Sequence, residues 1–359
     1  MARVLIVSSY PPRHCGIGAY ARTQAERLRA AGDDVVVISP ADGDGDVRVP
    51  FDGGRPFREA ARRGGKFDRI VVHFQPALYY LPGARASWSK MRTSAALLAL
   101  VRRQPQTEIV VHEADRPVRW RPDYALLRRA FARATLGFHT VAERDALRRE
   151  YRLPELRARL VDHTEGVTVH ARPSREEARA RLGVLPDEPL FLCAGFLHPD
   201  KGFDRAVRAF AAAGSPGRLA VVGSVRDATP ENRAWATELR ELARRTPGVD
   251  VREDYVSDED FDAWMAAADR LVLPYRRSWS SGALARARAL GTPALVAAAG
   301  GLPEQAGPAD RVFATDDELA ALIREAAAEV AADRREAAPA APARSPPTAP
   351  PGRATPLRA

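Results

Sequence analysis

Short apolar runs alternate along the chain with longer segments in which apolar residues recur at helical spacing. In the first half this pattern predicts strands at residues 4–8, 35–38, 69–73 and 109–112, and helices at 20–31, 94–103, 124–132 and 142–151. Apolar runs without polar alternation are typical of strands covered on both faces of a parallel sheet. The first half is therefore predicted to be a doubly wound α/β layer.

A second series of the same kind follows a linker around residues 170–174. Its strands are predicted at residues 190–194, 218–222, 249–253, 270–273 and 294–296, with helices between them. Because 359 residues exceed what one hydrophobic core usually serves, we expect two Rossmann-like domains, residues 1–170 and 171–336, that face a common cleft. Residues 337–359 are rich in Ala, Pro and Arg without apolar periodicity, and they are predicted to form a disordered tail.

The composition indicates a globular protein, with 45% hydrophobic and 28% charged residues. The longest apolar runs are far shorter than the ~18 residues that cross a bilayer, and Met1 leads almost directly into the first strand. The two cysteines have no metal-binding or redox spacing, which fits a reducing compartment. We expect a cytoplasmic protein, with peripheral contact at the inner face of the membrane as an open option.

Charge is distributed unevenly. Residues 1–170 hold 29 basic and 19 acidic side chains, a net charge of +10, whereas residues 171–338 hold 23 and 27, a net charge of −4. The basic half suggests an anionic partner, either a membrane surface or a phosphorylated substrate; an arginine-rich composition explains the asymmetry equally well. No nucleic-acid partner is expected. Because only three of the 55 basic residues are lysines, a lysine inside a motif carries information.

The first glycine-rich loop, SSYPPRHCGIGAY, precedes a predicted helix. Gly16 and Gly18 would let backbone amides approach a phosphate at the helix N-terminus. With Ala21 they also satisfy the weak dinucleotide pattern G-x-G-x-x-A. In a dinucleotide site, however, the first glycine follows the strand directly, whereas here the loop is longer. A plain tight turn is a further alternative.

The second domain holds two more loops of this type. Gly195 follows a predicted strand, and Lys201 and Gly202 lie where that loop meets a helix, a position suited to neutralising a diphosphate. Farther on, Ser280 and Ser281 are N-cap candidates for a helix that begins near Gly282. The amides of Ser281 and Gly282 would then face an anion. The Gly-Gly pair at residues 300–301 fits a turn and a ligand-facing role equally well.

The ordered string of motifs resembles the retaining GT-B glycosyltransferases of family 4. It runs from SSYPPRxCGIGxY through G-x-L-x-P-x-K-G, Y-V-S-D-E and G-T-P to G-G-L-P-E, and covers about residues 3–330. The resemblance implies two Rossmann-like lobes, a nucleotide-sugar donor on the second lobe, an acceptor on the first, and no metal or other cofactor. It implies that Gly16, Gly18, Lys201 and the Ser281–Gly282 amides hold the donor phosphates.

The resemblance also suggests a histidine beside the reacting sugar. His112 ends a predicted strand and matches that family position, although strand-end histidines are as often structural. For His73, at the end of a neighbouring strand, a structural role is favoured. His112 and Lys201 are therefore the candidate catalytic residues.

The chain departs from the family pattern at several positions. The family has two glutamates eight residues apart, one for the sugar and one for the ribose, and these positions are Ser278 and Arg286 here. Phe196 stands where many members have an arginine. Few residues follow position 332 to form the helix that usually crosses back to the first lobe, so looser closure of the lobes is expected.

We therefore expect a retaining, metal-independent transferase that moves a sugar from a nucleotide-diphosphate donor to a hydroxyl of a glycan, lipid-linked or small-molecule acceptor. A catalytically weak or inactive homologue that binds a nucleotide or glycan, or supports a partner enzyme, is the alternative. An NAD(P)-dependent enzyme rests on the first glycine loop alone. A calcium loop starting at Asp42 lacks the required glycine and glutamate, since those positions are Val47 and Gly53.

Overall fold

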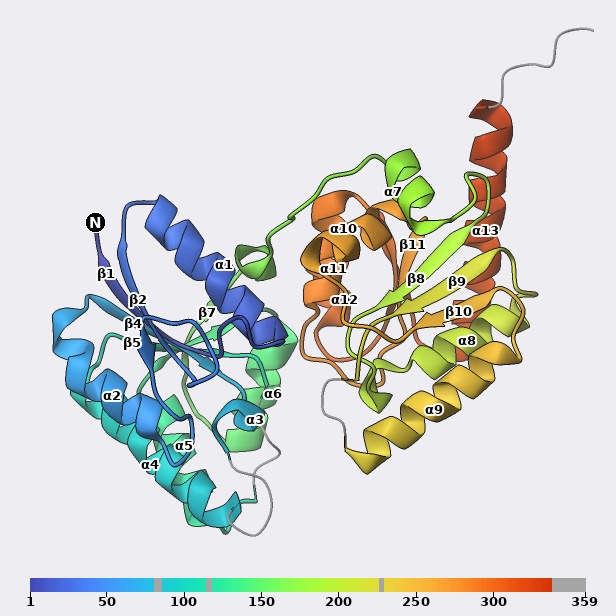
Figure 1. The fold of residues 1–359 in the computed structure, drawn as a ribbon. Helices are drawn as coiled ribbons and strands as arrows, with labels where there is room; N and C mark the ends of the chain where they lie inside the picture. Colours follow the sequence, from blue (N-terminus) through green and yellow to red (C-terminus); the bar gives the residue numbers. More distant parts are fainter. Residues whose placement is uncertain (81–85, 114–117, 226–228, 338–359) are drawn as a thin grey trace, which may run out of the picture.

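The computed structural model describes residues 1–80, 86–113, 118–225 and 229–337, and they form two parallel α/β domains (Figure 1). The predicted disordered tail lies outside the described residues except for Ala337. Two domains, each with a parallel sheet between helices, agree with the fold class expected from the apolar pattern.

The first domain contains a seven-stranded sheet in the order β3-β2-β1-β4-β5-β6-β7, and all neighbouring strands in it are parallel. Its strands are β1 (Arg3–Val7), β2 (Asp34–Ser39), β3 (Val47–Arg48), β4 (Arg69–Phe74), β5 (Thr107–Val111), β6 (Thr135–Phe138) and β7 (Arg157–Leu160). The central strands are buried along almost their whole length. This burial explains why most positions in these strands are apolar.

Helices cover both faces of this sheet. They are α1 (Gly16–Ala30), α2 (Arg55–Arg63), α3 (Pro76–Tyr79), α4 (Ala86–Arg103), α5 (Pro122–Phe131) and α6 (Val141–Tyr151), with short 3₁₀ turns η1 (Gly64–Lys66) and η3 (His163–Gly166). One apolar cluster packs α2, α4 and α5 against the sheet, and a smaller one packs α1 against the other face. The sequence pattern missed α2 and the strands β3, β6 and β7.

The second domain repeats the architecture with a six-stranded sheet in the order β10-β9-β8-β11-β12-β13. Its strands are β8 (Leu190–Ala194), β9 (Arg218–Val222), β10 (Val249–Arg252), β11 (Arg270–Leu273), β12 (Ala294–Ala297) and β13 (Arg311–Phe313). Five of these strands begin at the predicted residues. The sixth, β13, is short and lies at the sheet edge, where the apolar signal is weakest.

The helical elements of this domain are α7 (Arg175–Leu182), η4 (Pro199–Lys201), α8 (Phe203–Ala212), α9 (Pro230–Arg244), α10 (Asp258–Ala267), α11 (Gly282–Leu290), α12 (Leu302–Gln305) and α13 (Asp316–Ala337). A single apolar cluster joins them to the sheet. The long final helix α13 packs against α8 and therefore stays with the second domain (Figure 1).

In both sheets the chain crosses from one side to the other next to the central strand, β1 in the first and β8 in the second. Such a switch point leaves a crevice beyond the carboxyl ends of the strands. The loops that follow β1 and β8 are the two glycine-rich loops singled out from the sequence. None of the described helices is long and apolar enough to cross a membrane.

Candidate functional site

A cavity of about 450 Å³ lies between the domains, at the carboxyl ends of their central strands. Residues 11–16 and part of α1 line it from the first domain, and the segment that leads from the end of η3 into the linker contributes residues 166–168 and 170. The second domain contributes residues that follow β8, β9, β10 and β11. Its size and its position at two switch points are those of a small-molecule site.

Lys201 reaches this cavity from the end of η4. Its Nζ lies 3.9 Å from the centre of the Tyr275 ring, and both residues line the cavity. In the described part of the chain, no carboxylate forms an ion pair with Lys201. Its positive charge therefore faces the cavity against an aromatic ring rather than a counter-ion.

Gly202 lies behind Lys201 rather than in the cavity lining. It is the N-cap residue of α8 with φ +64°, and a Cβ at this position would lie 2.2 Å from the carbonyl oxygen of Pro274. A left-handed backbone and the close approach of β11 both require glycine here. Gly202 thus shapes the loop that presents Lys201, whereas Gly195 itself lines the cavity.

The N-terminus of α11 also lies at the cavity, and the helix begins at Gly282 with Ser281 as its N-cap, as expected. The Ser281 side chain caps the helix by accepting from the Leu284 amide, and the Ser281 amide donates to Gln305 Oε1 over 2.8 Å. The Ser281 amide is therefore already satisfied, contrary to the expectation that it faces an anion. Gly282 and Ala283 line the cavity at the first turn, so their amides are the ones in position.

The remaining predicted phosphate-side residues separate into two groups. Gly16, the first residue of α1, lines the cavity, but Gly18 does not. A Cβ on Gly18 would lie 3.2 Å from the Tyr10 amide nitrogen, so this glycine allows α1 to pack closely on the end of β1. Ser278 and Ser280 are also absent from the lining, and the Ser278 hydroxyl donates to the Ser280 carbonyl.

Arg286 is the part of the site that the sequence left unexplained. Its Nε donates to Asp262 Oδ1, its Nη1 lies 3.0 Å from Asp258 Oδ1, and its Nη2 donates to the Asp258 carbonyl oxygen. Asp262 is fully buried, and its other oxygen accepts from the His170 and Ala171 amides of the linker. The cation that replaces the family glutamate is thus held by two carboxylates of α10.

Asp258 joins this cluster to the first domain. Its Oδ2 lies 3.2 Å from Arg22 Nη2 on α1 and 3.6 Å from His170 Nε2. Burial alone would raise its pKa, but hydrogen bonding and charge from Arg286, together with His170 and Arg22, lower the pKa below its usual value. Asp258 therefore stays ionised at neutral pH, and 38% of its side chain remains exposed.

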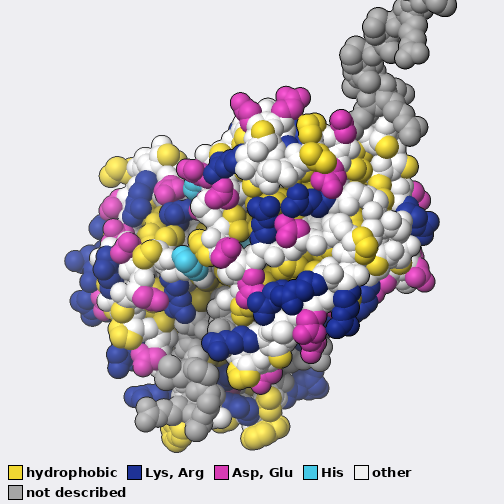
Figure 2. Space-filling view, turned by 45° about the vertical axis from the view of Figure 1, so that its right-hand side comes forward, with side chains coloured by type: hydrophobic (Ala, Val, Ile, Leu, Met, Phe, Trp, Pro, Cys, Tyr) yellow, Lys and Arg dark blue, Asp and Glu magenta, His cyan; other side chains and the backbone are white. Residues whose placement is uncertain are grey.

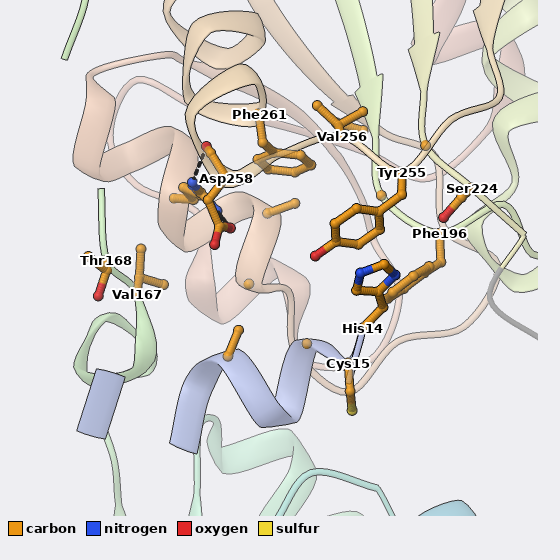
Figure 3. Close-up of a pocket in the computed structure, with 18 of the residues that line it drawn as sticks. His14, Cys15, Val167, Thr168, Phe196, Ser224, Tyr255, Val256, Asp258 and Phe261 are labelled. Carbon is orange, nitrogen blue, oxygen red and sulfur yellow. Dashed lines mark hydrogen bonds and ion pairs between the residues drawn. The ribbon is translucent and has the colours of Figure 1, made fainter. Parts of the chain in front are cut away.

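An aromatic wall closes another side of the cavity and was not foreseen. The His14 ring of the first domain stacks on the Tyr255 ring of the second, with centroids 3.5 Å apart and planes 4° apart. Phe196 lies beside this pair, and in the view of Figure 3 Phe261 lies between Asp258 and Tyr255. The position that carries arginine in many family members thus adds to an aromatic surface here.

His112 lies behind the cavity in a cluster of four histidines. His73, His112, His139 and His163 all contact the Tyr20 ring, with centroid distances of 5.2–5.8 Å. His73 Nε2 lies 3.1 Å from Gln24 Oε1, and its Nδ1 lies 2.9 Å from His112 Nε2. Since the Gln24 oxygen only accepts, His73 donates to it and accepts from His112. His112 is not in the cavity lining.

Within the described residues, no group of three or more His, Cys, Asp or Glu side chains is arranged to hold a metal ion. Burial lowers the pKa of all four histidines, so the cluster is uncharged at neutral pH where it packs between α1, the sheet and η3. Tyr20 Oη, His139 Nε2 and His163 Nδ1 are buried in it without a hydrogen-bond partner.

The fold matches solved GT-B glycosyltransferases over nearly its whole length. Sucrose-phosphate synthase from Thermosynechococcus elongatus aligns with a TM-score of 0.65 and 17% identity over 94% of this chain and 98% of that chain. The Anabaena protein HepE in complex with UDP aligns with a TM-score of 0.66 and 14% identity over 94% and 95%. These identities show the fold alone, and that fold is GT-B.

A family model matches within the second domain. Residues 188–331, which are less than half of the chain, match the family model described as glycosyl transferases group 1, in agreement with the resemblance found in the motifs. D-inositol 3-phosphate glycosyltransferases of Streptomyces bingchenggensis and Streptomyces coelicolor are 38% and 37% identical over 176 and 138 residues, or 46% and 36% of this chain. The matches cover only 38% and 30% of those two proteins.

The histidine cluster predicts acid sensitivity. Burial, with smaller effects from neighbouring charges, lowers the pKa of His73 to about 3, of His139 to about 4 and of His163 to about 3. Unfolded histidines titrate near 6.5, so the unfolded chain binds more protons between about pH 6.5 and these values. The free energy of unfolding therefore keeps its full value above pH 6.5 as far as these histidines are concerned. Below pH 6.5 it falls by up to about 1.4 kcal/mol per pH unit for each histidine.

Urea unfolding followed at pH 7.5, 6.5 and 5.5 measures this slope. The variant His163→Gln removes one titrating group, and its stability should fall less steeply with acidification than that of the wild type. Equal slopes for the two proteins between pH 6.5 and 5.5 would contradict the assignment.

Proposed function

We propose that the protein transfers a sugar from a nucleotide-diphosphate donor to a hydroxyl acceptor with retention of anomeric configuration and without a metal ion. The observation that carries this proposal is the meeting of Lys201, Gly195 and the α11 N-terminus at one interdomain cavity. The match of the second domain to the group 1 family model supports it, as does the UDP named in the HepE complex.

The leaving diphosphate sets the chemical task. An oxocarbenium-like transition state breaks the bond to the diphosphate early, so charge on the departing oxygens must be stabilised. Lys201 supplies a full positive charge, and the Gly282 and Ala283 amides supply the partial charge of a helix N-terminus. These groups are already in place, so we propose that no metal ion is needed to neutralise the leaving group.

Retention follows if the acceptor attacks from the face that the leaving group vacates. The departing phosphate oxygen would then take the acceptor proton, and no protein base would be required on the opposite face. His112 has its Nε2 committed to His73, which leaves Nδ1 as its free nitrogen. His112 contacts the Tyr20 ring and is not in the cavity lining. We propose that a local movement of Tyr20 lets His112 reach and orient the reacting sugar.

A second candidate function is nucleotide or glycan binding without turnover. It is favoured by the loss of both family carboxylates: the Ser278 hydroxyl is turned to its own loop, and Arg286 is held by α10. The diphosphate contacts would survive in such a protein, while contacts to the sugar would be weak.

Donor binding separates these functions. Thermal shift and calorimetry with UDP-, GDP- and ADP-glucose should show binding of at least one sugar nucleotide and none of NAD. Slow donor hydrolysis, unchanged by EDTA and giving the retained anomer by NMR, supports the transferase. Binding without hydrolysis or transfer supports the non-catalytic homologue, and binding of NAD alone would contradict both.

Replacing Lys201 tests the leaving-group assignment. Lys201→Ala removes the only full charge placed against the diphosphate in the proposal, so kcat for donor hydrolysis should fall by about 10²–10³-fold. Lys66→Ala is the matched control, because that lysine lies on the outside of the first domain in η1. Near-normal turnover of Lys201→Ala, with an unchanged melting temperature, would refute the role of Lys201.

We propose peripheral contact of the first domain with anionic membranes as the route to a lipid-linked acceptor. Two tryptophans of that domain are strongly exposed, Trp88 at 69% and Trp120 at 85%, and Arg92 and Arg119 are exposed near them in the sequence. Tryptophan favours the membrane interface, and cations favour anionic lipids. Elsewhere on the face shown in Figure 2, basic and acidic side chains are interleaved rather than gathered.

Vesicle sedimentation tests this contact. Binding to vesicles with 30% phosphatidylserine, about the anionic content of an inner leaflet, should exceed binding to neutral vesicles and weaken with salt. The double variant Trp88→Ala/Trp120→Ala should bind less at any salt concentration. If wild-type binding is the same with and without anionic lipid, the acceptor does not lie at such a surface.

A further inference from the structure

We infer that Asp258 is the carboxylate that binds the ribose hydroxyls of the nucleotide, in place of the acidic side chain that α11 lacks. This inference rests on the proposed donor site and names a residue that determines its specificity. Its basis is the position of Asp258 along the cavity, its fixed orientation and its remaining capacity to accept hydrogen bonds.

Position is set by the ion pair between Asp258 and Arg286. Arg286 lies four residues after Gly282 on α11, which corresponds to a rise of about 6 Å along the helix. The Arg286 backbone is therefore about one helical turn from a phosphate at the α11 N-terminus, and its guanidinium holds Asp258 beside the same cavity. In a nucleoside diphosphate, the group next to the α-phosphate is the ribose.

The aromatic side chains of the cavity also fit a bound nucleotide. Tyr255 precedes Asp258 by three residues and stacks on His14, with Phe196 alongside (Figure 3). The cavity lining thus holds a cation and helix-terminal amides at Lys201 and Gly282, a carboxylate at Asp258, and a flat aromatic surface at His14, Tyr255 and Phe196. These are the kinds of group that bind a diphosphate, a ribose and a base.

Orientation of the carboxylate is fixed from three segments of the chain. Arg286 on α11 contacts Oδ1 of Asp258, and Arg22 on α1 contacts Oδ2. His170 on the linker has its Nε2 3.6 Å from the same Oδ2. An ionised carboxylate has about four acceptor positions, so the two closest donors leave acceptor capacity. With 38% of the side chain exposed beside the cavity, vicinal hydroxyls can reach it.

The other carboxylate of the cavity lining lacks these properties. Asp254 is exposed, and among the described residues it has no ion-pair partner that would fix its orientation. Asp262 is fully buried, with both oxygens occupied by Arg286 and the linker amides. Among the described residues around the cavity, Asp258 is therefore the carboxylate that is both oriented and accessible. Asp254 provides a matched control.

The test compares each nucleotide with its 2′,3′-dideoxy form by calorimetry. UDP, GDP and ADP are titrated into the wild-type protein beside their dideoxy counterparts, and the base that binds most tightly is used thereafter. Hydroxyls bound to an ionised carboxylate should make the wild-type affinity at least about tenfold higher for the ribonucleotide. Asp258→Asn should reduce this ratio towards one, and Asp254→Asn should keep it.

The ratio separates recognition from structure. If Asp258 only holds the domains together, Asp258→Asn weakens both nucleotides equally and the ratio is preserved, which overturns the inference. A wild-type ratio near one overturns it as well, without any variant, even if Asp258→Asn fails to fold. If the wild-type protein binds none of the three nucleotides, the proposed donor site itself is refuted.

Discussion

A fully buried carboxylate organises the junction between the domains. Asp262 accepts hydrogen bonds from two linker amides through one oxygen and pairs with Arg286 through the other. Leaving such a charge without a partner inside a protein costs about 3–5 kcal/mol. The positions of the linker, α10 and α11 are therefore coupled through Asp262, and the cavity lies where these three segments meet.

This constraint explains why Arg286 is compatible with the site. An arginine in place of a glutamate would ordinarily reverse the charge of that part of the cavity. Here two aspartates of α10 balance it, and 14% of the Arg286 side chain is exposed. Asp258 is partly exposed at this point of the cavity, whereas Lys201 has no carboxylate partner among the described residues. With Arg286 on α11, the carboxylate at this point of the cavity is Asp258 on α10.

The apolar pattern was sufficient for the central strands of both sheets and for the loops at their switch points. Buried strands such as β8 and β9 are predicted to the residue, because both of their faces are covered and nearly every position is apolar. Strand β7 was not predicted, because its sequence RARL contains arginines. It lies at the edge of the sheet, where no apolar run is needed. Residues at turns of fixed geometry, such as Gly195 and Lys201, could also be located from the sequence.

Contacts between distant segments could not be predicted in this way. The pairing of Arg286 with Asp258 and Asp262 depends on how α10 and α11 pack, and the stacking of His14 on Tyr255 depends on how the two domains meet. Gly18 and His112 are absent from the cavity lining because each packs against residues of its own domain, Gly18 against Tyr10 and His112 against Tyr20. A motif fixes the local backbone of its own loop but not what the opposite domain places in front of it.

The attachment of the linker also has a mechanical consequence. His170 and Ala171 are bonded to Asp262 of the second domain, and β7 ends at Leu160 within the first sheet. Rotation of one domain against the other must be absorbed by the nine residues between those points, and η3 makes part of that stretch rigid. A hinge this short permits few directions of movement. The domains should swing about a nearly fixed axis, and Gly166, which packs against the Tyr20 ring, lies close to that pivot.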